Sequence, residues 1–513
     1  MLCSVLFKRR KKDGHMQDGS LLAAVDLGSN SFRLEIGRIE NGRVQRAEYI
    51  KETVRQGNGL DSERNLSQDA MERGWACLAR FSERLSNFDT AHVRAVATQT
   101  LREARNRDVF LVKAKQILGF PIEVISGHEE ARLIYVGVSH LLAQSDERRL
   151  VLDIGGRSTE LILGQGYQPG KAESYRLGSV AWSMRYFDDG QLTASAFAKA
   201  EIAAKAVLDE ASTEFAAQAW DSAYGSSGTV GAVADVLQAA GFSADGIGRD
   251  GLDWLRKRLL EAKHIDNLKL EGMKDDRRAV IAGGLSILQA LFDLLDIQTL
   301  HIAAGALRHG LLFDLLERED GVADVRQETV DRLASKFNVD AKHSARVRAT
   351  AAHLLAHTKS HDENLPTARL VRKTLWAAQL HEIGIKISHS DYHKHGAYIL
   401  DYAEAAGFAQ SELHRLSLLV LGQRGKLKKL GLMLSDPDFA AQLLALRLSV
   451  ILCHARQDPL LKGIELHTRT DGFVLNLPIA WTQAHPQSIY LLQEECVAWQ
   501  KLDWDFDIVM VGK

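Results

Sequence analysis

Apolar and polar residues alternate along two stretches of the chain, and each stretch follows a short apolar run. Residues 21–25 lead into the first stretch, 26–37, and residues 150–152 lead into the second, 153–164. Alternation with a period of two is typical of β-strands, and the Gly, Ser and Asn residues that interrupt it are typical of tight turns. We therefore predict a β-hairpin in each stretch.

The region up to about residue 318 alternates strand patterns with helical spacing, which favours an α/β architecture. The predicted elements are a helix over 66–85, a strand over 92–97, a strand over 121–125, a helix over 128–142, a helical stretch over 194–218, and strand-to-helix units at 223–229 and 300–316.

The pattern changes in the second part of the chain. Residues 326–456 show helical spacing almost throughout, whereas 463–508 alternate again around one helix near 488–500 and close on 504–511. Size alone predicts two to four domains. The expected organisation is a disordered leader (1–19), two α/β domains (20–133 and 134–318), an all-α domain (319–458) and a small α/β domain (459–513).

The two predicted hairpins repeat each other. They share Asp, Gly, Ser, Leu and Gly at the same five offsets, and the second begins 127 residues after the first. Self-similarity at this length indicates a duplicated architecture, although either hairpin alone could be an ordinary turn. Two such turns facing each other could hold one phosphate chain. The candidate phosphate ligands are Gly28, Ser29, Asn30, Ser31, Gly155, Gly156, Arg157, Ser158 and Thr159.

Acidic residues lie close to these turns. The carboxylates of Asp26, Asp153 and Glu160 could hold Mg²⁺, with Mn²⁺ as an alternative. Glu130 is in the first turn of a predicted helix, where an acid usually complements the helix dipole. A carboxylate at this strand-to-helix junction could instead reach a water molecule beside a terminal phosphorus.

Two further strand-to-helix turns supply candidate phosphate ligands. Arg102 lies one turn into a predicted helix, where it is either an anion ligand or a solvated surface residue. Ser227, Gly228 and Thr229 form a Gly/Ser turn between a predicted strand and a helix.

The net charge of −2 argues neither for nor against a polyanionic ligand, so any basic channel must be local. No nucleic-acid partner is expected. The four cysteines are scattered, which indicates a reducing cytoplasm. No apolar run is long enough to span a membrane. The apolar and basic segment 1–12 is either part of a disordered leader or a peripheral tether at the inner face of the membrane.

The ordered set of motifs resembles the exopolyphosphatase and guanosine pentaphosphate phosphohydrolase family of bacteria. The motifs are 26–31, 100–102, 126–132, 153–160, 227–229 and 305–308, and the similarity extends to 376–384 and 389–399. The resemblance implies two actin-like (ribonuclease H-like) domains with a cleft between them, an HD-like helical domain and a homodimer. It also implies Glu130 as the catalytic base, and Asp153 and Glu160 at a Mg²⁺ site.

The chain departs from this family pattern at two places. Arg157 stands where a glycine is usual, so either its backbone is strained or its guanidinium contacts phosphate. The helical part resembles HD-type metal phosphohydrolases, but the motif reads His381-Glu382 and no further ligand is evident, so a second metal centre is not expected. Six residues either line a polyphosphate channel or belong to an ordinary solvated surface, namely His393, Lys394, His395, Lys426, Lys428 and Lys429.

The leading expectation is a metal-dependent exopolyphosphatase that releases terminal orthophosphate from polyphosphate, in a processive manner because distant basic residues hold the chain. The same site could instead hydrolyse guanosine pentaphosphate. A kinase or ATPase of the actin-like superfamily is a third possibility, disfavoured because no inserted acceptor domain is evident.

Overall fold

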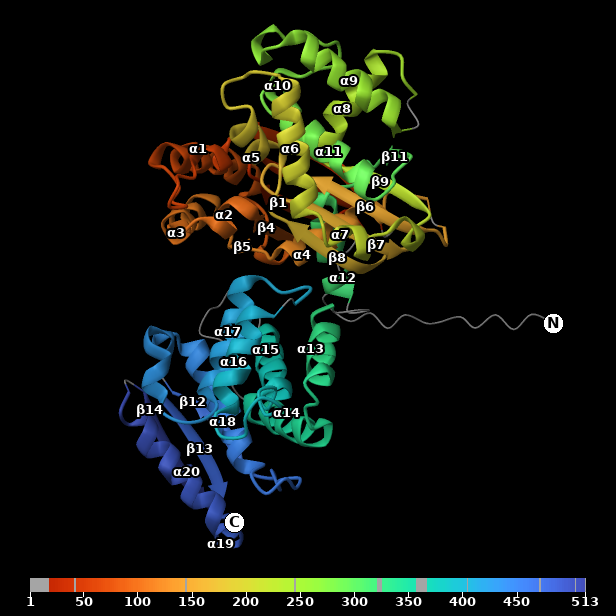
Figure 1. The fold of residues 1–513 in the computed structure, drawn as a ribbon. Helices are drawn as coiled ribbons and strands as arrows, with labels where there is room; N and C mark the ends of the chain where they lie inside the picture. Colours follow the sequence, from red (N-terminus) through yellow and green to blue (C-terminus); the bar gives the residue numbers. More distant parts are fainter. Residues whose placement is uncertain are drawn as a thin grey trace, which may run out of the picture. The chain divides into compact units, whose positions relative to one another are not determined.

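The computed structural model describes residues 18–40, 43–143, 145–243, 246–320, 325–356, 367–403, 405–469, 472–502 and 504–512. The chain divides into two compact units, Met1–Asp324 and Val325–Lys513 (Figure 1). This division falls slightly after the boundary predicted at 318/319. The leader predicted over 1–19, with its proposed membrane tether, lies outside the described residues except for Asp18 and Gly19.

The first unit begins with a five-stranded sheet in the order β3-β2-β1-β4-β5. Its central strand β1 is apolar and almost fully buried. Strands β1, β2 and β3 are antiparallel neighbours, whereas β4 and β5 continue parallel to β1. The strands are β1 (Leu21–Leu27), β2 (Ser31–Glu40), β3 (Arg43–Thr53), β4 (Val93–Ala97) and β5 (Ile122–Val124).

A second sheet in the same unit repeats this topology. Its order is β10-β11-β9-β6-β7-β8. Strands β6, β7 and β8 are antiparallel neighbours, and β9 and β11 run parallel to β6. The strands are β6 (Arg148–Ile154), β7 (Thr159–Gln165), β8 (Gln168–Tyr175), β9 (Ser222–Ser226), β10 (Ile247–Gly248) and β11 (Thr299–Ile302). The predicted duplication is confirmed by this topology.

Helices connect and cover the two sheets. The predicted helix at 66–85 is α1, whose side-chain cap is Ser67. The apolar residues at helical spacing along it are all buried, namely Met71, Trp75, Leu78, Phe81 and Leu85. The stretch 194–218 is divided into α6 and α7. The helices are α1 (Gln68–Leu85), α2 (Gln99–Glu103), α3 (Arg107–Leu118), α4 (Gly127–Ser139), α5 (Ser179–Tyr186), α6 (Ala194–Val207), α7 (Ala211–Glu214), α8 (Ser227–Ala239), α9 (Arg249–Ala262), α10 (Asp275–Arg278), α11 (Ile281–Leu294) and α12 (Leu307–Asp320).

Helices α4 and α12 join the two sheets. They pack so closely that a Cβ on Gly310 would lie 1.8 Å from the carbonyl oxygen of Leu133. Their apolar side chains share one core cluster with Leu22 and Val96 of the first sheet and with Val151 of the second. This shared core fixes the positions of the two hairpin turns relative to each other.

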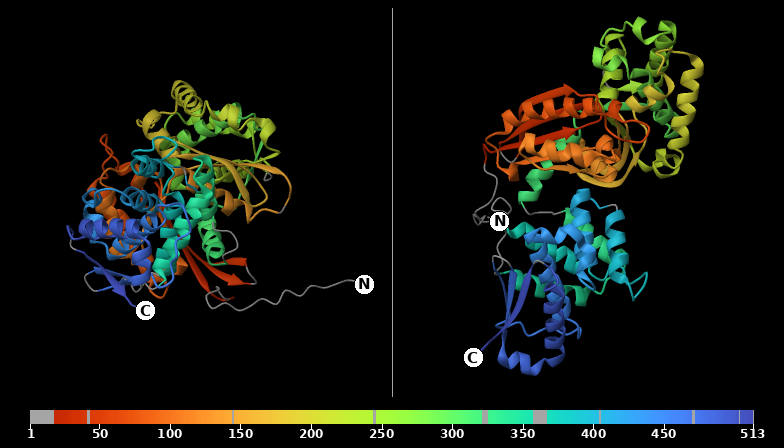
Figure 2. Two further views of the ribbon diagram at one scale, coloured as in Figure 1. Left: turned by 90° about the horizontal axis from the view of Figure 1, so that it is seen from below. Right: turned by 90° about the vertical axis from the view of Figure 1, so that its left-hand side faces the viewer.

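The second unit begins with helices, as predicted for 326–456. These are α13 (Val325–Lys336), α14 (Ala341–Leu355), α15 (Thr367–Leu380), α16 (Tyr392–Tyr402), α17 (Gln410–Gly422) and α18 (Pro437–Leu452). A sheet in the order β12-β13-β14 follows, drawn in blue in Figure 2. Its elements are β12 (Glu465–Thr468), β13 (Gly472–Pro478), α19 (Ile479–Ala484), α20 (Pro486–Trp499) and β14 (Asp505–Val511).

Two features of this unit differ from the prediction. The C-terminal part contains two helices instead of one, because α19 precedes α20. One apolar cluster also runs from Trp376 and Leu444 in the helices to Leu475 and Trp499 in the C-terminal part. The boundary predicted at 458/459 therefore does not divide the core. Among the described residues, no helix is both long and apolar enough to cross a membrane.

Candidate active site

The two hairpin turns of the first unit lie against each other. A Cβ on Gly156 would be 3.1 Å from the Cβ of Ser29 and 3.6 Å from the backbone nitrogen of Asn30. The turns also have the same shape, because a Cβ on Gly28 would lie 3.0 Å from the carbonyl of Ser31, and one on Gly155 would lie 3.0 Å from that of Ser158. The duplicated sequence therefore produces two matching turns at one gap.

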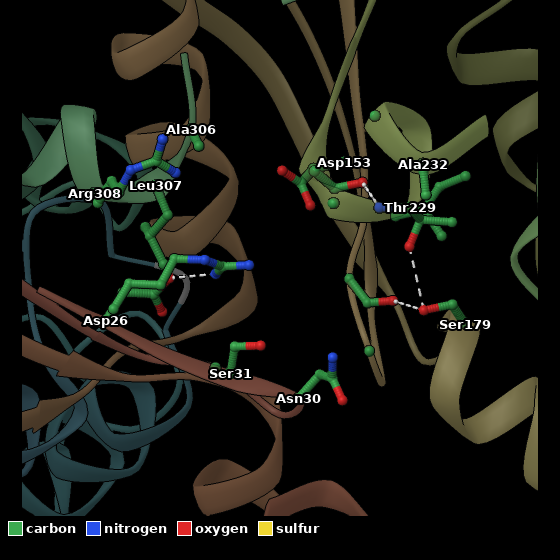
Figure 3. A pocket seen from close by; sticks show the side chains of 18 of the residues that line it. Asp26, Asn30, Ser31, Asp153, Ser179, Thr229, Ala232, Ala306, Leu307 and Arg308 are labelled. Atoms are coloured by element: carbon green, nitrogen blue, oxygen red, sulfur yellow. Dashed lines mark hydrogen bonds and ion pairs between the residues drawn. The ribbon is translucent and has the colours of Figure 1, made fainter. Parts of the chain in front are cut away.

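A polar cavity of about 580 Å³ opens at this gap. Figure 3 shows Asp26, Asn30 and Ser31 on one side of it and Asp153 and Thr229 on the other. The cavity brings together most of the residues that the sequence predicted for the site, which are Asp26, Gly28, Ser29, Asn30, Ser31, Glu130, Asp153, Gly155, Gly156, Ser158, Ser227, Gly228 and Thr229.

Glu130 reaches the cavity from the first turn of α4. The helix starts there because Ser126 accepts a hydrogen bond from the Glu129 backbone nitrogen. Glu130 is buried, and Arg102 Nη1 donates to its Oε2 at 3.1 Å. Burial raises the pKa of Glu130 to about 7, against the lowering effect of Arg102, and the nearby Asp26 and Asp153 raise it further. A carboxyl group with this pKa can exchange a proton near neutral pH.

Two further carboxyl groups share this environment. Burial raises the pKa of Asp153 to about 6, and burial together with Glu130 and Asp153 holds the pKa of Glu160 well above its usual value. Acids crowded in this way favour a bound dication, which would neutralise their repulsion. Among the described residues, these acids do not form a group of three His, Cys, Asp or Glu ligands close enough to hold an ion by themselves. This still fits Mg²⁺, which usually takes one or two carboxylates and completes its shell with water and phosphate oxygens.

Five basic residues also line the cavity, and none of them was identified from the sequence as a site residue. They are Arg33, Lys51, Lys274, Arg277 and Arg308, of which only Arg308 belongs to a motif noted above. Each contacts an acid: Arg33 pairs with Asp26, Arg308 with Glu35, Lys274 with Asp235, and Lys51 and Arg277 with Asp276. They come from distant parts of the chain, so no local pattern could have shown that they converge.

The third predicted turn has a strained backbone. Ser227 has φ 92°, in the left-handed region that residues other than glycine rarely adopt. Its hydroxyl accepts from the backbone nitrogens of Thr229 and Val230 in the first turn of α8. A Cβ on Gly228 would lie 2.3 Å from Arg277 Nη2. Glycine at this position therefore lets the Arg277 guanidinium approach the start of α8.

Four predicted site residues do not line the cavity. Arg102 supports Glu130 and also donates to the Ile125 carbonyl. Thr159 is fully buried and donates to the Leu177 carbonyl. Glu160 pairs with Asp153 across the β6–β7 ladder and accepts from Ser174. The roles of these residues thus stay predictions. Arg102 and Glu160 lie next to Glu130 and Asp153, respectively, which do line the cavity.

Arg157, the fourth, is not strained as the first alternative drawn from the sequence required. Its φ is not positive, so the backbone is not strained in the way considered. Its guanidinium donates to Glu103 Oε2 at 3.1 Å and to the Gly57 carbonyl at 3.1 Å, instead of pointing into the cavity. These contacts tie the second turn to the first sheet's loops, and the phosphate-ligand role of Arg157 stays a prediction.

The residues predicted for a polyphosphate channel belong to the second unit. His393, Lys394 and His395 are in the first turn of α16, and Lys426, Lys428 and Lys429 lie at the start of the 3-10 helix Leu427–Ser435. His393 is buried, whereas the three lysines of the second group are exposed. The channel stays a prediction.

The second unit also holds a ligand group that the sequence analysis missed. His343 of α14 lies beside His381 and Glu382, which follow α15. The expectation that His381-Glu382 has no further partner was therefore wrong. The partner comes from the preceding helix, and helix packing brings it there without a sequence motif.

Known proteins resemble the chain over nearly its whole length. The Ppx/GppA phosphatase family model matches residues 36–319, and the model of domain III of the Ppx/GppA phosphatases matches 325–496. A protein of Photobacterium profundum named guanosine-5'-triphosphate,3'-diphosphate pyrophosphatase is 37% identical over 94% of this chain and 97% of its own. A protein of Vibrio cholerae with the same name is 38% identical over 95% of this chain and 98% of its own length.

Solved structures share the fold of more than half of the chain. An exopolyphosphatase-like protein matches with a TM-score of 0.53 and 25% identity, over 59% of this chain and 99% of its own. An exopolyphosphatase from Cytophaga hutchinsonii gives a TM-score of 0.53 at 23% identity over the same shares. With the family models and the relatives taken together, this chain belongs to the Ppx/GppA phosphatase family and is a hydrolase.

Proposed function

We propose that this protein hydrolyses guanosine pentaphosphate, releasing orthophosphate from the 5'-triphosphate and leaving guanosine tetraphosphate. The relatives at 37–38% identity that carry this activity in their names align over 94–95% of the chain, which supports this substrate over long polyphosphate. The observation that carries the chemistry is the buried carboxyl group of Glu130 at a cavity formed by two matching turns.

The reaction needs a water molecule placed in line with the terminal phosphorus. In the proposed mechanism, ionised Glu130 accepts a proton from this water as its oxygen forms a bond to phosphorus. The bond between phosphorus and the bridging oxygen breaks, and the electron pair stays on the guanosine tetraphosphate product. Because the pKa of Glu130 is about 7, the carboxylate and its acid are both populated at neutral pH.

The remaining cavity residues position the phosphates. Backbone and hydroxyl donors of Ser29, Ser31 and Ser158 suit phosphate oxygens, and Arg308 is held toward the cavity by its contact with Glu35. Asp153 and Glu160, with Asp26, would hold Mg²⁺ or Mn²⁺, which would neutralise charge on the phosphates. This division of roles suits phosphoryl transfer, which depends mainly on positioning and charge neutralisation.

Polyphosphate is the second candidate substrate. Its terminal anhydride needs the same catalytic groups, and the basic residues that line the cavity do not distinguish a polyphosphate chain from a nucleotide polyphosphate. The discriminating measurement is kcat/KM for guanosine pentaphosphate and for long-chain polyphosphate on the same preparation, with Mg²⁺ present. A ratio of at least tenfold in favour of the nucleotide is expected, and the reverse ratio would restore polyphosphate as the main substrate.

Glu130→Gln tests the base. The amide has nearly the same shape but cannot accept the proton, so kcat is expected to fall about 10²- to 10⁴-fold. Glu72→Gln on the exposed surface of α1 is the matched control and should keep wild-type activity. Full phosphate release by Glu130→Gln would refute the assignment.

A further inference from the structure

Three side chains in the second unit form a compact group outside the proposed active site. His343 lies in the first turn of α14, and His381 and Glu382 lie directly after α15. One ligand atom from each can be chosen so that all three lie within 4.8 Å of one another. All three side chains are buried, with 5%, 1% and 8% of their surface exposed.

The hydrogen bonding of His381 leaves one ring nitrogen available as a ligand. Its Nδ1 is 2.7 Å from the carbonyl oxygen of Ala378, and because a carbonyl only accepts, Nδ1 must carry the hydrogen. Nε2 therefore presents a lone pair, and it is buried without a hydrogen-bond partner among the described residues. Metal-binding histidines commonly have this arrangement, with the other nitrogen bonded to a carbonyl.

His343 also has a ring nitrogen that makes no hydrogen bond with the described residues. Its Nδ1 is buried and finds no partner in the described part of the chain, and its Nε2 lies 3.9 Å from Glu382 Oε1. The centroids of the His343 and His381 imidazole rings are 5.3 Å apart. Burial lowers the pKa of both histidines, that of His381 to about 4. Unpartnered polar atoms in a protein interior are uncommon, and a bound ion would account for them.

We propose that His343, His381 and Glu382 bind a divalent transition-metal ion, with Zn²⁺ as the best match. Two imidazoles and one carboxylate are a common zinc ligand set, whereas Mg²⁺ prefers oxygen ligands. At Zn–ligand distances of about 2.0–2.1 Å, tetrahedral ligand atoms lie about 3.3 Å apart, so the side chains must move by roughly 1 Å. Three protein ligands leave a coordination position for water. The site is independent of the phosphate chemistry proposed for the first unit.

Arg456 competes with the ion for Glu382. Its Nη2 donates to Glu382 Oε1 at 2.6 Å, and its Nη1 donates to Asp340 Oδ2 at 3.1 Å. Its side chain is 48% exposed, so it can leave Glu382 while keeping its contact with Asp340. A metal ion must displace this guanidinium from the carboxylate. Removing it should therefore strengthen metal binding, whereas a purely structural histidine pair would show no such gain.

The test uses the full-length protein after removal of metals with a chelator. With about 10 mM Mg²⁺ present to occupy carboxylate sites, Co²⁺ is titrated as a spectroscopic probe and Zn²⁺ by calorimetry. One equivalent is expected to bind, with visible absorption bands for Co²⁺. His381→Ala and His343→Ala should each weaken binding at least tenfold, and Arg456→Gln should tighten it severalfold. His467→Ala, which alters a partly buried histidine of β12 paired with Glu465, should leave metal binding unchanged.

Folding of each variant is checked by its melting temperature without metal. Where His381→Ala melts early, His381→Gln keeps most of the side-chain volume. Zn²⁺ should raise the melting temperature of the wild type and of His467→Ala but not of the His381 variant. The proposal is overturned when the wild type binds no Co²⁺ above Mg²⁺, when the His381 variant binds as the wild type does, or when Arg456→Gln leaves the affinity unchanged or weaker.

Discussion

The Arg102–Glu130 pair should set the pH at which the enzyme becomes active. The guanidinium donates to the carboxylate at 3.1 Å, and both side chains are largely buried, with 13% and 10% of their surface exposed. An opposite charge at this distance usually lowers a carboxyl pKa by about 1–3 units. Loss of the charge in Arg102→Met should therefore move the pKa of Glu130 from about 7 to roughly 8–10.

This shift can be measured as a change in the pH profile. At pH 7 the ionised fraction of Glu130 would fall from about one half to between about one tenth and one thousandth, which lowers kcat/KM about 5- to 500-fold. The assay is orthophosphate release from guanosine pentaphosphate between pH 6 and 9.5 at constant Mg²⁺. Activity of the variant should recover as the pH rises, because the base becomes ionised again.

Two controls separate charge from structure. Arg102→Lys keeps the charge, so the pH below which activity falls should lie close to that of the wild type. Arg105→Met, at an exposed neighbouring position, should leave the pH profile unchanged. Arg102 also donates to the Ile125 carbonyl, so the melting temperature of each variant is compared. If the activity of Arg102→Met and of the wild type fell at the same pH on the acid side of the profile, this account of the Glu130 pKa would be refuted.

Three further results are expected. The folded-state pKa of Glu130 lies above its usual 4.5, so the protonated group stabilises the fold below about pH 4.5, and about 3 kcal/mol of this stabilisation is lost as the pH rises through 7. Chemical denaturation should therefore show that Mg²⁺ stabilises the protein more at pH 8 than at pH 5, and an equal Mg²⁺ effect at both pH values would count against a metal at these acids. Arg157→Gly should lower stability by about 1–3 kcal/mol through the loss of its contact with Glu103 while KM changes less than twofold, and a large rise in KM would return Arg157 to the phosphate ligands. Gly156→Ala should lower kcat/KM at least tenfold with little change in melting temperature, since a Cβ there lies 3.1 Å from that of Ser29 and must push the turns apart; wild-type kcat/KM would contradict the close fit of the turns.

The sequence alone determined the elements that depend on local patterns. The twin hairpins follow from alternation and turn residues, α1 follows from its 3.6-residue apolar spacing and Ser67 cap, and the duplication follows from identical residues at identical offsets. These features were predictable because period and turn chemistry act over a few residues. Asp26 and Asp153 beside the turns were predictable for the same reason, because each stands near the end of the strand that leads into its turn.

The tertiary structure decided what depends on long-range packing. It directed Arg157 to Glu103 instead of the cavity, gathered Lys51, Lys274 and Arg277 around it, and placed His343 against His381. It also merged the C-terminal strands with the helical core. Each of these contacts joins residues from separate elements, and the sequence carries no local signal for such a contact, because it forms only once whole helices and sheets bury their apolar faces against one another.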